Sequence, residues 1–142
     1  MSTSKIIGDA GEHYALSQFS FNGIFGVKMP DNWKSYDLII DYGERLHRVS
    51  VKTRTESRGW KSSKWFHWGK NDKFDFLVLI FKHEEGLIDS WILPRTLAVE
   101  YSTKPGEEAK DQNLMEIKWN TLLNTPSLEH CKENWQMNFI LE

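Results

Sequence analysis

Residues 36–54 read YDLIIDYGERLHRVSVKTR, and they contain two β-strand patterns. The first, at residues 36–42, is rich in Ile, Leu and Tyr and ends at Gly43, where a short turn fits. The second, at residues 46–54, has side chains that alternate between two faces. One face carries Val49, Val51 and Thr53, and the other carries Arg48, Ser50, Lys52 and Arg54. This stretch therefore predicts a β-hairpin.

The segments around the hairpin complete an α/β pattern. Apolar residues recur at helical spacing in residues 4–22, and the run FDFLVLIF at residues 74–81 is typical of a strand covered on both faces. Further strands are expected at residues 24–29, 90–93 and 115–119, a helix at 95–101, and short helices or irregular packing at 121–138. This order predicts an α/β domain with a mixed central β-sheet flanked by helices.

The composition fits one domain in a reducing compartment. The chain has 142 residues and a single cysteine, Cys131, which excludes an intramolecular disulfide. The first thirty residues contain no unbroken apolar stretch, so we expect neither a signal peptide nor a membrane span. We therefore expect a single domain over residues 1–142, located in the cytoplasm.

The net charge of −2 conceals an uneven distribution of charge along the chain. Residues 45–73 hold nine Lys or Arg against two acidic residues, which is a net charge of +7, and the segments on either side are acidic. A clustered basic segment is typical of proteins that bind nucleic acid. A DNA partner therefore fits the sequence in spite of the low net charge.

Four polar side chains are expected near the hairpin. Asp37 opens its first strand, Ser50 and Lys52 share one face of its second strand, and Glu12 lies on the preceding helix. Carboxylate and other oxygen donors suit a hard divalent cation such as Mg²⁺, which polarises a phosphoryl oxygen while a lysine stabilises the developing negative charge. The pattern therefore predicts a site for metal-assisted chemistry on a phosphate.

Five motifs follow one another along the chain: Gly11-Glu12, YDLII at 36–40, RVSVKT at 48–53, FDFLV at 74–78 and WILP at 91–94. Together they resemble the PD-(D/E)XK nuclease superfamily, and most closely the subgroup of archaeal Holliday-junction resolvases and restriction-like homing endonucleases. The resemblance covers about residues 5–98 and leaves a C-terminal extension, about residues 99–142, unmatched. It implies a restriction-endonuclease-like core and metal-dependent cleavage of DNA.

The resemblance also implies roles for individual residues. Asp37 would be the metal-binding aspartate and Lys52 the lysine of the (D/E)XK element. The Val51 carbonyl and Glu12 would complete the ligands of Mg²⁺ or Mn²⁺, with Asp75 in support. Resolvase-like relatives act as dimers, which leaves monomer and homodimer as open alternatives.

Ser50 departs from the family pattern, because most members have Asp or Glu at this position. Three explanations remain open. Ser50 holds a metal-bound water in a weakened site, a carboxylate such as Glu56 has taken over the role, or the site is inactive.

The other acids and the lysine also have simpler interpretations. Asp9 and Glu12 could form a helix capping box, Asp37 could cap a strand, and Lys52 could be an ordinary solvated lysine.

Residues 55–72 are basic and rich in Trp, and we expect them to form a long functional loop. Cations there would bind phosphates, and rings would stack on bases. The alternative is that the rings belong to the core. The expected DNA-binding residues are Arg54, Arg58, Trp60, Lys61, Lys64, Trp65, Trp68 and Lys70.

Other kinds of site lack support in the sequence. The five His residues show no zinc-ligand spacing, and there is no GxGxxG, Walker or GxSxG motif. Three functions therefore stand. The first is a metal-dependent DNA endonuclease with catalytic Asp37, Lys52, Glu12 and Ser50. The second is an inactive DNA-binding module of the same fold. The third is a phage or defence-system component that binds a protein partner.

Overall fold

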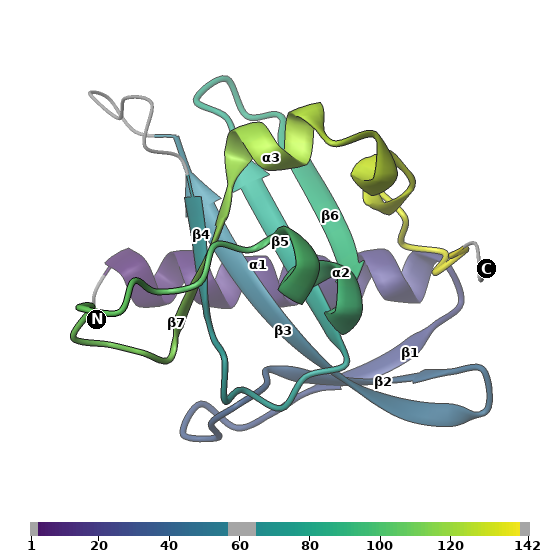
Figure 1. The fold of residues 1–142 in the computed structure, drawn as a ribbon. Helices are drawn as coiled ribbons and strands as arrows, with labels where there is room; N and C mark the ends of the chain where they lie inside the picture. The colour runs from purple at the N-terminus through teal and green to yellow at the C-terminus, as the bar shows by residue number, and fades with distance from the viewer. Residues whose placement is uncertain (1–2, 57–64, 140–142) are drawn as a thin grey trace.

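The computed structural model describes residues 3–56 and 65–139. The elements are, in chain order, α1 (Thr3–Phe21), β1 (Phe25–Lys28), β2 (Leu38–Tyr42), β3 (Arg45–Thr55), β4 (Trp65–Gly69), β5 (Phe76–Lys82), β6 (Ile88–Pro94), α2 (Arg95–Tyr101), β7 (Leu114–Lys118), α3 (Trp119–Asn124) and a 3-10 helix, η1 (Pro126–Cys131). Figure 1 shows how these elements are arranged around the main sheet.

The main sheet has five strands in the order β1-β2-β3-β5-β6. Strands β3 and β5 are parallel, and the other neighbouring pairs are antiparallel, so the sheet is mixed as predicted. The expected hairpin joins β2 to β3, with Tyr42 paired to Arg45. Both turn residues, Gly43 and Glu44, have positive φ, which matches the twist of a two-residue hairpin.

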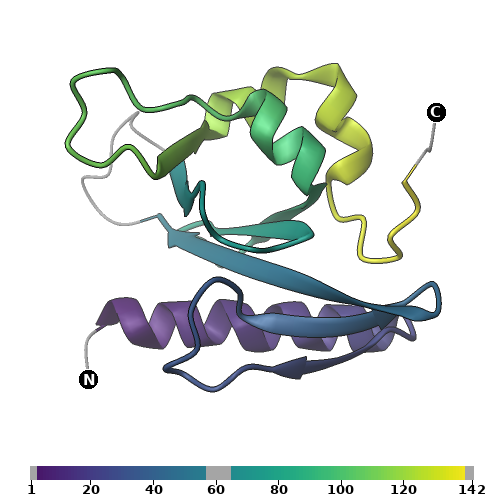
Figure 2. The same cartoon turned by 60° about the horizontal axis from the view of Figure 1, so that its bottom comes forward.

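The sheet separates two hydrophobic clusters (Figure 2). Helix α1 covers one face and buries Ala15 and Phe19 against Val51 of β3 and its neighbours. Helices α2 and α3 and the small β4-β7 sheet cover the other face over β5 and β6. Because both of its faces are covered, β5 is apolar almost throughout, as the sequence predicted.

Helix α1 begins at Thr3 and ends before Gly23, whose φ is 77°. The N–H of Ile24 bonds back to Phe19, which closes the last turn. Because the helix begins six residues before Asp9, the capping-box interpretation of Asp9 and Glu12 is wrong. In the described ranges 3–56 and 65–139, none of the helices has both the length and the apolar character required to cross a bilayer.

One segment differs from the sequence-based expectations, and a second is placed for the first time by the structure. Part of the expected loop at residues 55–72 is a strand, β4, which pairs with β7 and buries Phe66 and Trp68. The C-terminal segment is part of the core on both faces of the sheet. Cys131 lies in the cluster under α3, and Trp135 lies in the cluster under α1. The C-terminal extension therefore packs against the rest of the chain on both faces of the sheet.

Candidate active site

Asp37 lies immediately before β2, beside a free edge of β3. Pairing between the two strands begins at Leu38 and Val49, so β3 continues beyond Val49 without β2 beside it. The Asp37 carboxylate takes the place of a neighbouring strand, because its Oδ2 accepts the Val51 N–H at 2.8 Å. The Val49 carbonyl accepts the Asp37 N–H on the same side. Since backbone groups alternate along a strand, the Val51 carbonyl points to this side as well.

The surroundings of Asp37 make its negative charge unfavourable. Burial raises the pKa of Asp37, and the charge of Asp72 adds to this effect. The Val51 N–H and the positive charges of Lys52 and Lys28 act in the opposite direction, but the pKa remains raised. A cation bound beside Asp37 would therefore stabilise the charged carboxylate, which the surrounding protein groups alone do not do.

Glu12 reaches the same region from α1. Burial raises the pKa of Glu12, and the charge of Asp37 is the next largest cause. The two carboxylates line one cavity of about 260 Å³, between α1 and the loop at residues 29–37. Their mutual repulsion and shared cavity show that Glu12 and Asp37 form one acidic site.

Lys52 approaches Asp37 from the other face of the sheet. It pairs with Leu79 of β5, which belongs to the cluster under α3, so its side chain lies on the face opposite α1. Its positive charge lowers the pKa of Asp37. Glu12 and Lys52 therefore lie on opposite faces of the sheet, and Asp37 interacts electrostatically with both.

Ser50 has a different environment from that of a metal ligand. Its side chain is only 2% exposed, and its hydroxyl donates a hydrogen bond to the Ser35 carbonyl at 3.2 Å. Ser35 has a φ of 84°, which is unusual for a residue other than glycine. Ser50 therefore helps to hold the loop that leads into Asp37.

Glu56 is engaged elsewhere, so the explanation that it replaces the missing acid is wrong. It lies five residues beyond Val51 on the chain, roughly 16 Å away along an extended strand. There its carboxylate lies 3.6 Å from His83 and accepts the Glu84 N–H at 3.3 Å. The acid that does act on Asp37 from outside the predicted set is Asp72, whose Oδ2 also accepts the Gly69 N–H.

An ion-pair network that the sequence analysis missed borders Glu12. Lys28 Nζ lies 2.8 Å from Asp31, 3.6 Å from Glu12 and 3.9 Å from Asp9. Lys5 joins the network through Asp9 at 3.1 Å and Asp31 at 3.2 Å. The spacing of Lys5 and Asp9 on a helix was the one signal in the sequence, because residues four apart share a face.

The residues at this site fit a hard divalent cation. In residues 3–56 and 65–139, no three His, Cys, Asp or Glu side chains are grouped so that they could hold a metal ion. Glu12 and Asp37 nevertheless offer two carboxylates at one cavity, and the Val51 carbonyl lies on the side of β3 that faces Asp37. Mg²⁺ usually keeps several waters and binds proteins through only one or two carboxylates, so this oxygen set suits it.

Asp75, expected to support the site, instead joins two strands. Its carboxylate accepts the Arg48 N–H at 2.8 Å and bonds to the Arg48 guanidinium at 3.2 and 3.3 Å. Burial raises the pKa of Asp75, but the hydrogen bonds from Arg48 outweigh it and hold the pKa below its usual value. Asp75 therefore positions β3 against the start of β5.

The expected DNA-binding residues differ in how far they are exposed to solvent. Arg54 and Lys70 are exposed. Trp65 is partly buried and stacks on His67, with the ring centroids 5.9 Å apart. Trp68 is 2% exposed and its Nε1 donates to Ser102, so it is a core residue. The other four lie outside the described residues: Arg58, Trp60, Lys61 and Lys64.

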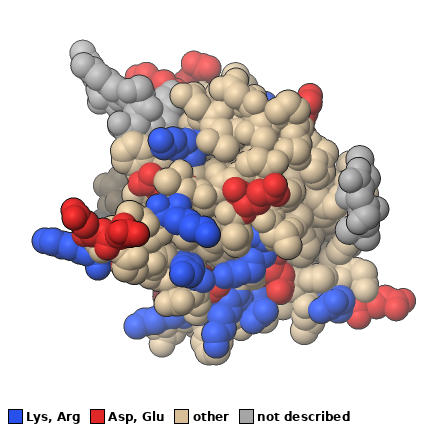
Figure 3. Space-filling model, in the orientation of Figure 1, with Lys and Arg blue, Asp and Glu red and all other residues tan. Residues whose placement is uncertain are grey.

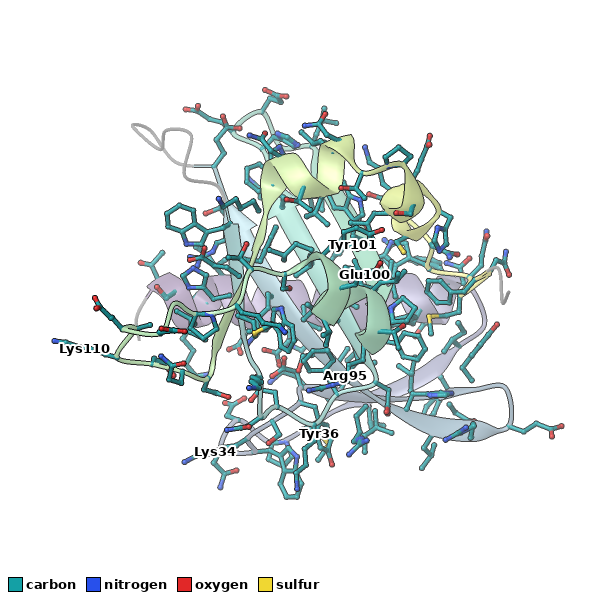
Figure 4. The ribbon with its side chains drawn as sticks, viewed as in Figure 1. Lys34, Tyr36, Arg95, Glu100, Tyr101 and Lys110 are labelled. Carbon is teal, nitrogen blue, oxygen red and sulfur yellow. The ribbon has the colours of Figure 1, made fainter. Side chains whose placement is uncertain are left out.

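Lys and Arg side chains gather on the face seen in Figure 3, below and to the left of its centre. Figure 4 places Arg95, Lys34 and Tyr36 in this region. Trp33, next to Lys34 in the sequence, is 50% exposed and contacts Tyr36 edge to face. The loop before Asp37 therefore presents a cation and an exposed ring that the sequence analysis did not single out.

Two solved structures are similar to this fold. The structure of I-Ssp6803I, a bacterial homing endonuclease, matches with a TM-score of 0.58 and 20% identity, over 94% of this chain and 90% of that chain. The structure of Hjc, a Holliday junction resolvase from Archaeoglobus fulgidus, matches with a TM-score of 0.51 and 10% identity, over 80% of this chain and 85% of that chain. No protein-family model and no curated protein matches the sequence. With its mixed five-stranded sheet flanked by helices, the chain has a restriction-endonuclease-like, nuclease-type fold.

Proposed function

We propose that the chain is a metal-dependent DNA endonuclease that hydrolyses phosphodiester bonds at Asp37. The observation that supports this most is the position of Asp37, at a free strand edge between Glu12 and Lys52. The fold is that of nucleases, and the similar structures include a homing endonuclease and a Holliday junction resolvase.

In this proposal, Asp37, Glu12 and the Val51 carbonyl hold Mg²⁺ or Mn²⁺. Such an ion supplies positive charge to a phosphate and lowers the pKa of water. Lys52, on the other side of Asp37, stabilises the negative charge that develops on the phosphate oxygens. The hydrogen bond from the Val51 N–H fixes the Asp37 carboxylate, so that the site is formed before the substrate binds.

The exposed cations beside the site give DNA a place to bind. Lys34 lies three residues before Asp37, Lys70 lies in the turn that ends at Asp72, and Lys73 follows that turn. Phosphate contacts of this kind supply most sequence-independent affinity for DNA. Trp33 offers an exposed ring for contact with a base or sugar.

A second candidate function is a DNA-binding module that has lost cleavage. Ser50 favours this function, because it stands at the (D/E) position where the family pattern has an acid. Its hydroxyl is buried and donates a hydrogen bond to the Ser35 carbonyl, so it does not replace that acid. This module would bind DNA through the same cations, and its binding would be unaffected by EDTA.

Nicking of supercoiled plasmid in Mn²⁺ distinguishes the two functions. The enzyme nicks the plasmid in Mn²⁺ and stops in EDTA. Asp37→Asn abolishes nicking, whereas Asp41→Asn, a matched change of an exposed carboxylate on β2, leaves it intact. If the protein binds the plasmid in EDTA and never nicks it, the binding module is correct. Nicking that survives Asp37→Asn would contradict the proposed site.

A further inference from the structure

Lys28 is the last residue of β1, and its side chain is directed toward Glu12 by the sheet. It pairs with Leu38, which is buried in the cluster under α1. Opposite residues on paired strands share a face, so Lys28 also extends toward α1. Its side chain is 20% exposed and that of Glu12 is 17% exposed, so water screens this pair less than a surface ion pair.

The two ion pairs of Lys28 differ in length. Its Nζ lies 2.8 Å from Asp31 but 3.6 Å from Glu12. Asp31 is much more exposed than Glu12, with 62% of its side chain accessible. The Lys28 ammonium can therefore lose its contact with Glu12 and remain paired with Asp31. Asp31 lies where water can also solvate the ammonium.

A divalent ion at Glu12 and Asp37 would lie close to the Lys28 ammonium. Like charges at this distance repel, and the repulsion is stronger in a partly buried site than in water. The ammonium and a metal ion would share the single negative charge of Glu12, so each weakens the attraction of the other to that carboxylate.

We propose that Lys28 is an internal counter-ion of Glu12, which a divalent metal ion displaces on binding, leaving the ammonium paired with Asp31. This inference rests on the proposed metal site. In the metal-free protein Lys28 offsets the repulsion between Glu12 and Asp37. It thereby sets the concentration of metal at which the site fills, which makes it a positioning residue and not a metal ligand.

Direct binding of Mn²⁺, measured from the electron paramagnetic resonance signal of the free ion, tests the proposal without any need for cleavage. Lys28→Met keeps an unbranched side chain that is one atom shorter and removes its charge, and we expect it to bind Mn²⁺ about tenfold more tightly than the natural protein. Lys34→Met removes the same charge from an exposed position and should change the affinity less than about twofold. Circular dichroism checks that each variant is folded.

Asp31→Asn gives the opposite prediction. It removes the carboxylate that receives the displaced ammonium, so Lys28 stays paired with Glu12 and Mn²⁺ binds more weakly than to the natural protein.

If the natural protein binds Mn²⁺ and Lys28→Met binds it with the same or lower affinity, Lys28 is not a competing counter-ion, and the proposed function is unaffected. If both lysine variants bind more tightly by the same factor, the effect is general electrostatics and the inference fails. If no variant binds Mn²⁺, the inference and the proposed metal site fail together.

Discussion

A Cβ atom on Gly11 of α1 would lie 1.7 Å from Oγ1 of Thr53 on β3. The helix therefore touches the strand at a point where no larger residue fits. Glu12 is the next residue in the chain, so this contact sets how far the Glu12 carboxylate lies from Asp37. Thr53 Oγ1 is buried there without a hydrogen-bond partner, which is consistent with packing as the reason for the contact.

Gly11→Ala should therefore lower the free energy of unfolding by about 1–3 kcal/mol, because α1 must move away from the sheet. Urea unfolding measures this loss. Thr53→Ala in the same chain removes Oγ1 and should recover part of it, although Thr53 Cβ would still lie 2.9 Å from the new methyl group. A Gly11→Ala protein as stable as the natural one would show that the helix is not held at this distance.

The raised pKa values of Asp37 and Glu12 predict how stability depends on pH. Both groups hold a proton more tightly in the folded state than in the unfolded state. Their contribution to stability is therefore present at low pH and is lost as the pH rises through the folded pKa values. Asp37→Asn and Glu12→Gln should be more stable than the natural protein at neutral pH, and this advantage should disappear below about pH 4.

Urea unfolding across this pH range, without divalent metal, checks the prediction. Asp41→Asn, at an exposed position, serves as the control and should follow the natural protein. Reduced stability of both site variants at neutral pH would mean that Asp37 and Glu12 stabilise the fold, as ordinary structural carboxylates do.

The exposed cations near the site predict the salt dependence of DNA binding. Lys34→Ala, Lys70→Ala and Lys73→Ala should each weaken binding to duplexes of any sequence, and each lost phosphate contact lowers the slope of log K against log salt by about 0.9. Fluorescence anisotropy in EDTA at several salt concentrations gives this slope. Lys132→Ala is the control, because Lys132 lies beside Asp89 and Trp91 of β6, which forms the other edge of the main sheet from β1. Equal slopes in all four variants would place DNA elsewhere on the surface.

Ser50 predicts different outcomes for two substitutions. Ser50→Ala removes the hydrogen bond to Ser35 and should lower the free energy of unfolding by about 1 kcal/mol. Ser50→Glu should be more destabilising, because it buries a carboxylate beside the Ser35 carbonyl and adds negative charge near Asp37. Thermal unfolding of both variants shows which of them is less stable. If Ser50→Glu is as stable as the natural protein, the position still accepts the acid that the family pattern has there.

The sequence alone predicted most of the main sheet. The hairpin at Gly43 and the strand at residues 74–81 were recognised because their side-chain patterns arise from local burial and turn geometry. Strand β4 was missed, because it is short, with only Phe66 and Trp68 buried, and its partner β7 begins 45 residues after β4 ends. Long-range pairing of this kind leaves little local signal.

The candidate site was predicted only in part, for a similar reason. Asp37 and Lys52 were expected together from the hairpin, and Glu12 from its place on the preceding helix, while its role as a metal ligand came from the family resemblance. Lys28 was not singled out, because its relation to Glu12 depends on how α1 crosses β1. The hydrogen bond from Ser50 to the Ser35 carbonyl could not be predicted either. It depends on the left-handed backbone conformation of Ser35, which is unusual for a residue other than glycine.

A crystal of the protein soaked in Mn²⁺ tests the central claim most directly, because anomalous scattering locates the ion itself. We expect an anomalous peak at coordination distance, about 2.1–2.2 Å, from Asp37 and the Val51 carbonyl, with Glu12 bound directly or through water. The peak should be absent from Asp37→Asn. A fully soaked crystal with no peak at Asp37, or with an unchanged peak in Asp37→Asn, would contradict the metal site and the cleavage chemistry built on it.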